Sequence, residues 1–231
     1  MARIMYDLCG EDTALRFSPF CWRAALAMRH KGLTLETRPW HFSDKQDIAF
    51  SNQEKVPVIV DEDDEVVTDS FDIMTWLDQK YPGPALFGDD MARSRARFIK
   101  HWAETTLAPA LMKIAILDVF SIIDPKDQPY FRESREARFG MTLEAFQNTE
   151  QGLEMLDKAL PPLRAQLEGS DFIDGDHPGG ADYLVFGMFM LAYVVREQPL
   201  LKAEDPVAQW HERMLDLFGA MARNAPRVGT R

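Results

Sequence analysis

The chain has 231 residues, enough for one large domain or two small ones with a substantial core. Hydrophobic residues make up 46% of it and charged residues 27%, an ordinary composition for a soluble globular protein. Its net charge of −11 disfavours nucleic acid or an anionic membrane as a partner, because neutralising phosphates requires clustered lysine and arginine side chains.

Cysteine content and apolar patterning favour a cytoplasmic protein. The two cysteines, Cys9 and Cys21, cannot build a disulfide framework, and the N-terminus does not resemble a signal peptide. The longest apolar run covers 183–195 and is bounded by Asp182 and Arg196, so it is too short to span a bilayer. We therefore expect a protein of a reducing cytoplasm that does not enter a membrane.

The first 80 residues alternate between extended and helical patterns. Pro19 at a first helical position and Gly32 at a helix end mark the first helix. The acidic run 61–65 predicts a solvated turn inside a hairpin, rather than a metal site. In chain order we expect a strand over 3–8, a helix over 18–32, strands over 33–40, 56–61 and 65–68, and a helix over 71–80. The predicted order is βαβ followed by ββα.

The remainder of the chain has helical periodicity almost throughout. Residues 82–91 are expected to form a linker, which separates an α/β domain over 1–81 from an all-helical domain over 92–231. Within the second domain, helices are expected over 92–123, 142–167, 183–195 and 207–221. Pro109 lies inside the first of these and should kink it.

The motif Ser18-Pro19-Phe20-Cys21 has the spacing of a redox C-P-x-C site, with serine in place of the attacking cysteine. A helix N-terminus attracts anions through its unpaired N–H groups and its dipole, and the Ser18 hydroxyl can also donate a hydrogen bond outward. In the simpler interpretation, Ser18 only caps its own helix.

Two further dipeptides could recognise a peptide ligand. Pro57 opens an apolar strand and belongs at an edge or a bend; if the Val56–Pro57 bond is cis, the Val56 backbone is free to pair with a peptide. An ordinary trans proline on an edge strand is the alternative. Asp69 and Ser70 begin another helix and offer an acid for an ammonium and a hydroxyl for a carboxylate, unless they serve only as a cap.

These three pieces, in this order and spacing, resemble the glutathione transferase family over nearly the whole chain. The resemblance implies a thioredoxin-like N-terminal domain, an all-helical C-terminal domain and glutathione as co-substrate. By position it implies that Ser18 activates the glutathione thiol and that Val56, before the cis Pro57, pairs with the cysteinyl backbone. Asp69 and Ser70 would hold the γ-glutamyl end.

The resemblance extends to the other end of glutathione and to a subgroup. Lys55, and less directly Gln53 or His41, would meet the glycyl carboxylate. The stretches "SPFCWRAALAMRHKGL", "KVPVIVD" and "VVTDS" are most similar to the bacterial β-etherases and their fungal relatives, which use glutathione to cleave aryl ethers of lignin type. The family is associated with detoxification, and its members are commonly dimers, so a homodimer is expected.

A small hydrophobic or aromatic second substrate should bind between the domains. Its candidate contacts follow the second strand or lie on the apolar stripe of the first long helix: Trp40, Phe42, Met112, Ile116 and Phe120. The same stripe can equally be core. The five histidines have no metal-ligand spacing, and no metal is expected.

Two other functions stay open at this point. The chain could be a thiol oxidoreductase or glutathione lyase that works through Cys9 or Cys21, although Ser18 at the attacking position argues against it. It could also be a non-catalytic binding module that keeps the fold, although the complete set of three motifs argues against that.

Overall fold

A four-stranded mixed sheet forms the first part of the chain in the computed structural model, which describes residues 2–230. The strands are β1 (Ile4–Leu8), β2 (Glu36–Trp40), β3 (Val58–Val60) and β4 (Val66–Thr68), in the order β2-β1-β3-β4. β1 pairs in parallel with β2 and antiparallel with β3, and β3 pairs antiparallel with β4. The expected βαβ and ββα order is confirmed.

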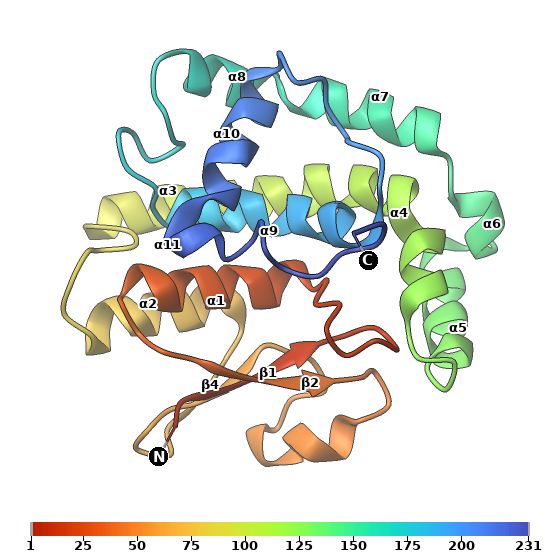
Figure 1. Cartoon of the computed structure of the whole chain (residues 1–231), viewed down its shortest axis with the longest axis horizontal. Coiled ribbons are helices and arrows are strands. Elements are labelled where there is room, and N and C mark those ends of the chain that lie inside the picture. Colours follow the sequence, from red (N-terminus) through yellow and green to blue (C-terminus); the bar gives the residue numbers. More distant parts are fainter. Residues whose placement is uncertain (1, 231) are drawn as a thin grey trace.

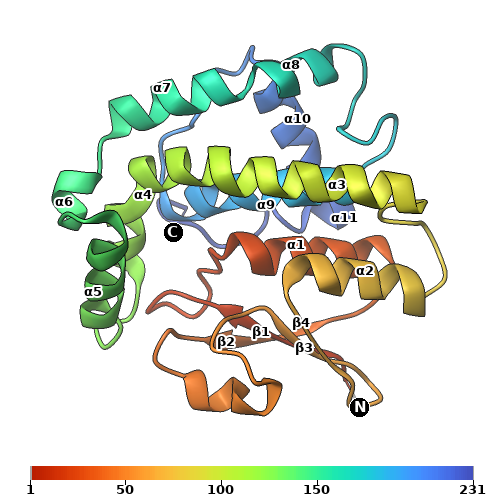
Figure 2. The same ribbon diagram turned by 180° about the vertical axis from the view of Figure 1, so that it is seen from behind.

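Helices α1 (Pro19–His30) and α2 (Ser70–Lys80) cover one face of this sheet. A short 3₁₀ helix, η1 (Lys45–Ser51), lies on the other side, orange in Figure 2. The start and end signals of α1 are as predicted: Pro19 is its first residue, and Gly32 follows it at a φ of +69°, where glycine has no steric cost.

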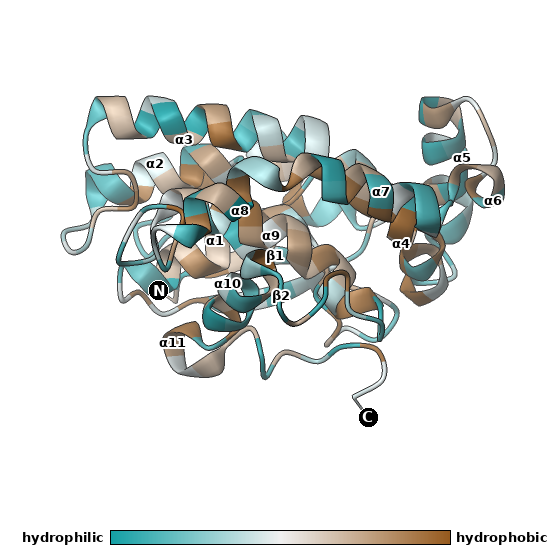
Figure 3. Cartoon of the chain, turned by 90° about the horizontal axis from the view of Figure 1, so that it is seen from above, coloured by the Kyte–Doolittle hydropathy of each residue, from teal (hydrophilic) through white to brown (hydrophobic). Residues whose placement is uncertain are grey.

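The second part of the chain is helical, as expected (Figure 1). α2 ends at Lys80 and α3 begins at Asp90, and no helix or strand lies between them. The elements that follow are α3 (Asp90–Trp102), the π-helical turn η2 (Ala103–Leu107), α4 (Ala108–Ile122), α5 (Gln128–Phe139), α6 (Leu143–Phe146), α7 (Thr149–Ala159), α8 (Pro161–Glu168), α9 (Gly180–Val195), α10 (Pro206–Leu215) and α11 (Leu217–Ala220). Figure 3 shows α7 banded in hydrophilic and hydrophobic colours, as a helix with one buried face should be.

A π-helical turn, η2, lies just before Pro109, where the sequence predicts a kink. Proline has no N–H to donate to the carbonyl four residues earlier, here that of Thr105, and η2 contains this carbonyl. The continuous helix Asp90–Ile122 is long and apolar enough to cross a membrane, a property that core helices of soluble proteins share. Its α4 portion packs against α7 and α9.

Two helix predictions for the second domain need correction. The single helix expected over 142–167 is three helices, because Gln147 is extended and Asn148 caps α7, accepting a hydrogen bond from the Gln151 N–H at 2.9 Å. The last helix, expected over 207–221, ends at Leu215 and is followed by α11. In addition, α5 lies in a stretch for which no element was predicted.

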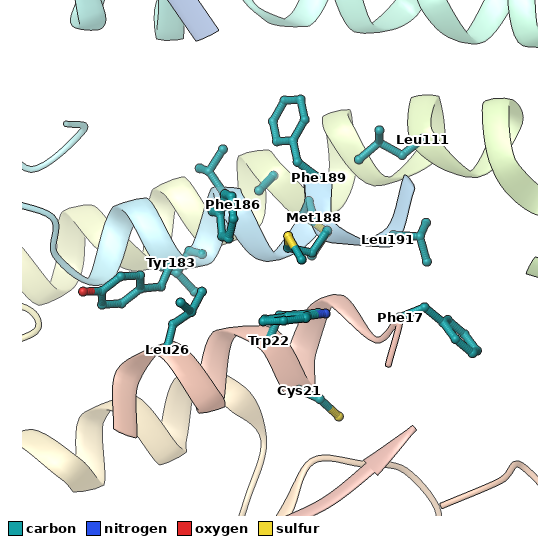
Figure 4. Packing of buried hydrophobic residues seen from close by; sticks show 14 of the residues in the cluster. Phe17, Cys21, Trp22, Leu26, Leu111, Tyr183, Phe186, Met188, Phe189 and Leu191 are labelled. Carbon is teal, nitrogen blue, oxygen red and sulfur yellow. The ribbon is translucent and has the colours of Figure 1, made fainter. Parts of the chain in front are cut away.

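The two domains meet where α1 packs against the buried helix α9. Figure 4 shows Trp22 and Leu26 of α1 facing the side chains of α9, among them Met188. Gly187 permits this close approach, because a Cβ there would lie 2.5 Å from the carbonyl oxygen of Pro19. A buried helix of the second domain therefore supports the segment that carries Ser18.

The start of α9 is held by the carboxylate of Asp182, which has no exposed surface. It accepts hydrogen bonds from the backbone N–H groups of Ile173, Asp174 and Gly179 and from the Trp210 indole, at 2.8, 3.2, 3.1 and 2.8 Å. The Asp174 side chain accepts from the Ala181 N–H at 2.8 Å, so it caps α9 in place of a side chain at Gly179. A Cβ at Gly179 would clash with that carboxylate.

Candidate active site between the two domains

Side chains from both domains line a cavity of about 610 Å³. Its wall includes six of the residues singled out in the sequence: Ser18, Trp40, Phe42, Lys55, Val56 and Met112. The first five come from the N-terminal domain and Met112 comes from α4. Fold and chain connectivity thus bring together a helix N-terminus, an exposed lysine and an apolar wall.

Ser18 is the N-cap of α1, and its Oγ accepts a hydrogen bond from the Cys21 N–H at 3.3 Å. The capping interpretation is therefore confirmed, and it does not exclude the other one. Capping uses a lone pair of the oxygen, so the hydroxyl proton stays available as a donor. The 12-residue helix also directs the positive end of its dipole to this point. A thiolate held here would meet both a donor and a favourable field.

The Val56–Pro57 bond is cis, and Pro57 is buried whereas Val56 is partly exposed. Lys55 is exposed at the cavity wall. Gln53 is exposed two residues earlier, where its N–H donates to Ser51 Oγ at 3.3 Å, and it does not line the cavity. The cis alternative of the sequence analysis is therefore the correct one.

Asp69 and Ser70 stand at the N-terminus of α2, outside the lining of the cavity. Asp69 Oδ1 accepts from the N–H groups of Phe71 at 2.8 Å and Asp72 at 3.3 Å, so this residue caps the helix. Ser70 is 2% exposed, and its Oγ has no hydrogen-bond partner within residues 2–230. Its hydroxyl therefore has hydrogen-bonding capacity that no described group uses.

Three further predicted contacts, in addition to Gln53, Asp69 and Ser70, lie away from the cavity wall. The His41 ring binds Asp44 Oδ2 through Nδ1 at 2.9 Å and does not line the cavity. Ile116 is fully buried in the core of α4, and Phe120 packs against Phe131 with ring centroids 6.2 Å apart. The apolar stripe of α4 thus divides, with Met112 at the cavity and Ile116 and Phe120 away from it.

Much of the apolar wall was not anticipated from the sequence. It comes from the segment before α1 and its first turn, from α5 and α6, and from the core helices α4 and α9; examples are Phe17, Phe20, Tyr130, Phe131, Phe139, Phe146, Leu111 and Met188. α5 had a readable signal, because Pro129 stands in its first turn and Gly140 ends it at a φ of +68°.

Asp127 joins this wall to the N-terminal domain. Its carboxylate is 1% exposed and accepts from the backbone N–H groups of Phe42 at 2.8 Å and Ser43 at 2.9 Å. Asp127 immediately precedes α5, so its buried side chain holds the Phe42 loop against this helix. The Phe42 ring centroid accordingly lies 5.7 Å from that of Phe131 and 6.3 Å from that of Tyr130. No local pattern in the sequence indicates this contact.

The two cysteines are poorly suited to thiol chemistry. Both are free, both are 1% exposed, and neither lines the cavity. Burial raises the pKa of Cys9 to about 11 and that of Cys21 well above its usual value, so neither forms a thiolate readily near neutral pH. This argues against the oxidoreductase alternative. The cytoplasmic location stays a prediction.

The acidic turn encloses a lysine side chain. The carboxylates of Asp61, Asp63 and Glu65 lie within 4.8 Å of one another, and Lys80 Nζ is 2.6, 2.7 and 2.9 Å from them. Arg3 Nε adds a further contact to the buried Asp61 at 2.7 Å. The ammonium group thus already supplies the positive charge that these carboxylates require.

Beside the first turn of α1, the buried carboxyl of Asp7 gives a testable pH dependence. Burial raises its pKa to about 6, partly offset by Arg16 at 3.6 Å. Because the folded-state pKa exceeds the unfolded value, stability is lost as pH rises from about 4 to 6, by about 3 kcal/mol at most. Asp7→Asn should remove this loss, making the variant more stable than the natural protein at pH 7.5 but not at pH 4.

Denaturant unfolding at several pH values measures this effect. The exposed Asp176→Asn variant is the matched control, and it should leave the pH profile unchanged. If the free energy of unfolding has the same pH dependence in Asp7→Asn and the natural protein, ionisation of Asp7 does not destabilise the folded state.

The architecture and site define a class: a thioredoxin-like domain followed by an all-helical domain, with a ligand cavity between them at the N-terminus of α1. Comparison with known families agrees. Residues 95–221 match the family model of the glutathione S-transferase C-terminal domain, and residues 13–85 match that of the glutathione S-transferase N-terminal domain. The chain therefore belongs to the glutathione S-transferase family.

Individual relatives share the fold at low sequence identity. Glutathione S-transferase omega-1 of Mus musculus is 26% identical over 222 residues, which cover 86% of this chain and 78% of the relative. Glutathione transferase GSTFuA3 from Phanerochaete chrysosporium is 21% identical, with a TM-score of 0.83 over 92% of this chain and 96% of that one. A glutathione S-transferase of Ceriporiopsis subvermispora, solved in complex with glutathione, is 18% identical, with a TM-score of 0.82 over 93% and 95%.

Proposed function

We propose that this protein is a glutathione transferase in which Ser18 holds the glutathione thiolate for attack on an apolar, aromatic electrophile. The observation that carries the proposal is the position of Ser18, at the N-terminus of α1 and on the wall of the same cavity as Trp40, Phe42 and Met112. Family membership and the glutathione complex of a structural neighbour support it.

In this proposal the N-terminal domain binds glutathione along its length. The backbone of Val56 pairs with the cysteinyl residue, and Lys55 binds the glycyl carboxylate. At the γ-glutamyl end, the free hydroxyl of Ser70 donates to the carboxylate and Asp69 binds the ammonium. Gln53 and His41 are the less direct candidates, since the His41 ring is engaged with Asp44 and Gln53 is exposed away from the cavity wall.

The narrower form of the proposal is aryl-ether cleavage. The thiolate sulfur attacks the carbon beside a carbonyl and forms a C–S bond, while the C–O bond to the aryloxide breaks. The electron pair leaves with the aryloxide, which takes a proton from water and becomes a phenol. Holding both reactants in one cavity supplies the entropic part of the rate acceleration.

A titration calorimeter and a thioether assay test the function directly. We expect glutathione to bind, and we expect the complex to form thioethers from a phenacyl aryl ether or from an activated haloarene. Absence of glutathione binding overturns the proposal. Binding without thioether formation from either electrophile instead favours the non-catalytic module.

We also propose a homodimer, formed through the face of α3 that carries Met91 and Phe98. These side chains are 62% and 74% exposed and lie two helical turns apart on one face. A charge at Phe98 would be buried in such an interface, so Phe98→Glu should shift the molar mass in light scattering from dimer to monomer. The exposed Met141→Glu variant is the control, and a natural protein that is monomeric at micromolar concentration contradicts the proposal.

A further inference from the structure

Two arginines of α5, Arg135 and Arg138, line the cavity without an acidic partner. Within residues 2–230, no carboxylate oxygen lies within 4.0 Å of either guanidinium group. The acids on the same wall are already paired: Glu104 with Arg23 at 2.6 Å and Lys100 at 3.0 Å, and Glu54 with Lys45 at 2.9 Å. The wall therefore carries uncompensated positive charge in a chain whose net charge is −11.

Arg135 keeps N–H groups for a ligand beyond those that bond the side chains of Ser134 and Tyr130. Its guanidinium carbon lies 4.4 Å from the centroid of the Phe131 ring and 5.2 Å from that of Phe42, and Nη1 donates to Ser134 Oγ at 2.8 Å. Burial lowers its pKa, yet a guanidinium stays charged at neutral pH. A partly buried cation stacked on aromatic rings, with N–H groups left over, is suited to a planar anion.

Arg138 follows one helical turn later and is exposed, which places it where the cavity meets solvent. Arg138 thus places a positive charge at the mouth of the cavity, and Arg135 places a second one deeper, next to the aromatic rings. Tyr130, on the same helix, extends that wall.

We propose that the second substrate is an aromatic compound with a carboxylate, and that Arg135 and Arg138 bind this carboxylate while its ring packs on Phe42 and Tyr130. The inference rests on the proposed function and narrows its substrate class. The apolar wall alone would accept any neutral arene of suitable size. The arginines add a preference for the anionic one, because a neutral ligand leaves a desolvated cation without a partner.

The γ-glutamyl carboxylate of glutathione does not explain these arginines. The residue expected to bind it, Ser70, begins α2, and Figure 2 places α2 and α5 at opposite sides of the molecule. The glycyl carboxylate is assigned to Lys55, which lines the same cavity as the two arginines. A competition measurement therefore has to distinguish the arginine site from the glycyl site.

A pair of ligands that differ only in charge tests the inference. The probes are 4-(phenacyloxy)benzoic acid and its carboxamide, titrated calorimetrically into protein saturated with S-methylglutathione, which cannot react. We expect the benzoate to bind about tenfold or more tightly than the carboxamide, as for a hydrogen-bonded charge. Arg135→Gln and Arg138→Gln should each reduce that ratio, so either variant suffices if the other fails to fold.

The matched control is Arg132→Gln, which makes the same change of charge on the same helix. Arg132 is paired with Glu136 and Glu144 and does not line the cavity, so its loss should leave the ratio unchanged. Equal affinities of the two probes overturn the inference, as does displacement of S-methylglutathione by the benzoate. A preserved benzoate preference in a protein that does not bind S-methylglutathione would overturn the proposed function and leave the arginine site standing.

Discussion

Replacing Ser18 with alanine is expected to raise the pKa of the bound glutathione thiol by about one to two units, because a hydrogen bond to a charged group contributes about 1.5–3 kcal/mol. A thiol with a reference pKa near 8.5 must fall about two units, or about 2.7 kcal/mol, to be mostly ionised at neutral pH. The dipole at the start of α1 contributes about 0.3–1 kcal/mol of this, so the hydroxyl has to supply most of the rest.

The ultraviolet absorbance of the thiolate, followed across pH in the saturated complex, measures this shift. Alanine also removes the cap of α1, at a cost of about 1 kcal/mol in stability, whereas glycine at an N-cap costs only about a few tenths. Ser18→Gly therefore separates capping from thiolate stabilisation: the free energy of unfolding should stay close to that of the natural protein, whereas the pKa of the bound thiol should rise. Thr142→Ala, which removes the cap of α6, is the control for loss of a cap elsewhere.

An unchanged thiol pKa in both Ser18 variants would mean that another group stabilises the thiolate. Retained binding of glutathione would then leave the proposed glutathione site standing while removing Ser18 from the mechanism. The same titration on the natural protein without glutathione gives the baseline for Cys9 and Cys21, whose raised pKa values keep them silent near neutral pH.

The largest expected loss of stability follows from Asp182→Ala, which should lower the free energy of unfolding by about 4 kcal/mol or more. The substitution leaves three backbone N–H groups and the Trp210 indole N–H without their acceptor; the donors of Gly179 and Trp210 are buried, and those of Ile173 and Asp174 are partly buried. Each buried donor left without a partner costs about 1–3 kcal/mol. Because α9 supports α1, the loss reaches the segment that presents Ser18.

Denaturant unfolding of three variants gives a graded comparison. Asp182→Asn retains one acceptor oxygen and should fall between the natural protein and Asp182→Ala. The control is Asp89→Ala, which removes the exposed cap of α3, a hydrogen bond from Ala92 N–H at 2.8 Å, and should cost about 1 kcal/mol. If Asp182→Ala costs no more than this control, the network at the start of α9 is not a major determinant of stability.

In the first domain, the features that local sequence patterns specify were predicted correctly, whereas in the second domain the helix boundaries within 142–167 and 207–221 were wrong. Ser18, Pro19 and Gly32 delimit α1 through backbone conformation and capping, which depend on a few neighbouring residues. The alternation of strands with helices in the first domain follows from hydrophobic periodicity in the same way. For the Val56–Pro57 bond, the sequence left both the cis and the trans conformation open, and the folded structure has the cis one.

Contacts between segments that are far apart in the chain could not be predicted from the sequence. The hydrogen bonds of Asp127 to the Phe42 loop join residues more than 80 positions apart. Ile116 and Met112 share one helical stripe, and only the packing of α4 decides that Met112 lies on the cavity wall and Ile116 in the core. The helix α5 has few buried residues and so lacks a strong hydrophobic periodicity, although Pro129 and Gly140 mark its two ends.

The proposed glutathione site and much of the proposed second-substrate site lie in different segments of the chain. The proposed nucleophile is activated at residue 18, whereas a large part of the wall that meets the acceptor belongs to the short segment 128–146. Asp127 attaches that segment to the Phe42 loop through backbone N–H groups, a contact that tolerates any side chain on the other side of the bond. Under the proposed function, substitutions in α5 and α6 would change the binding site of the second substrate and leave Ser18 and the glutathione site in the other domain unchanged.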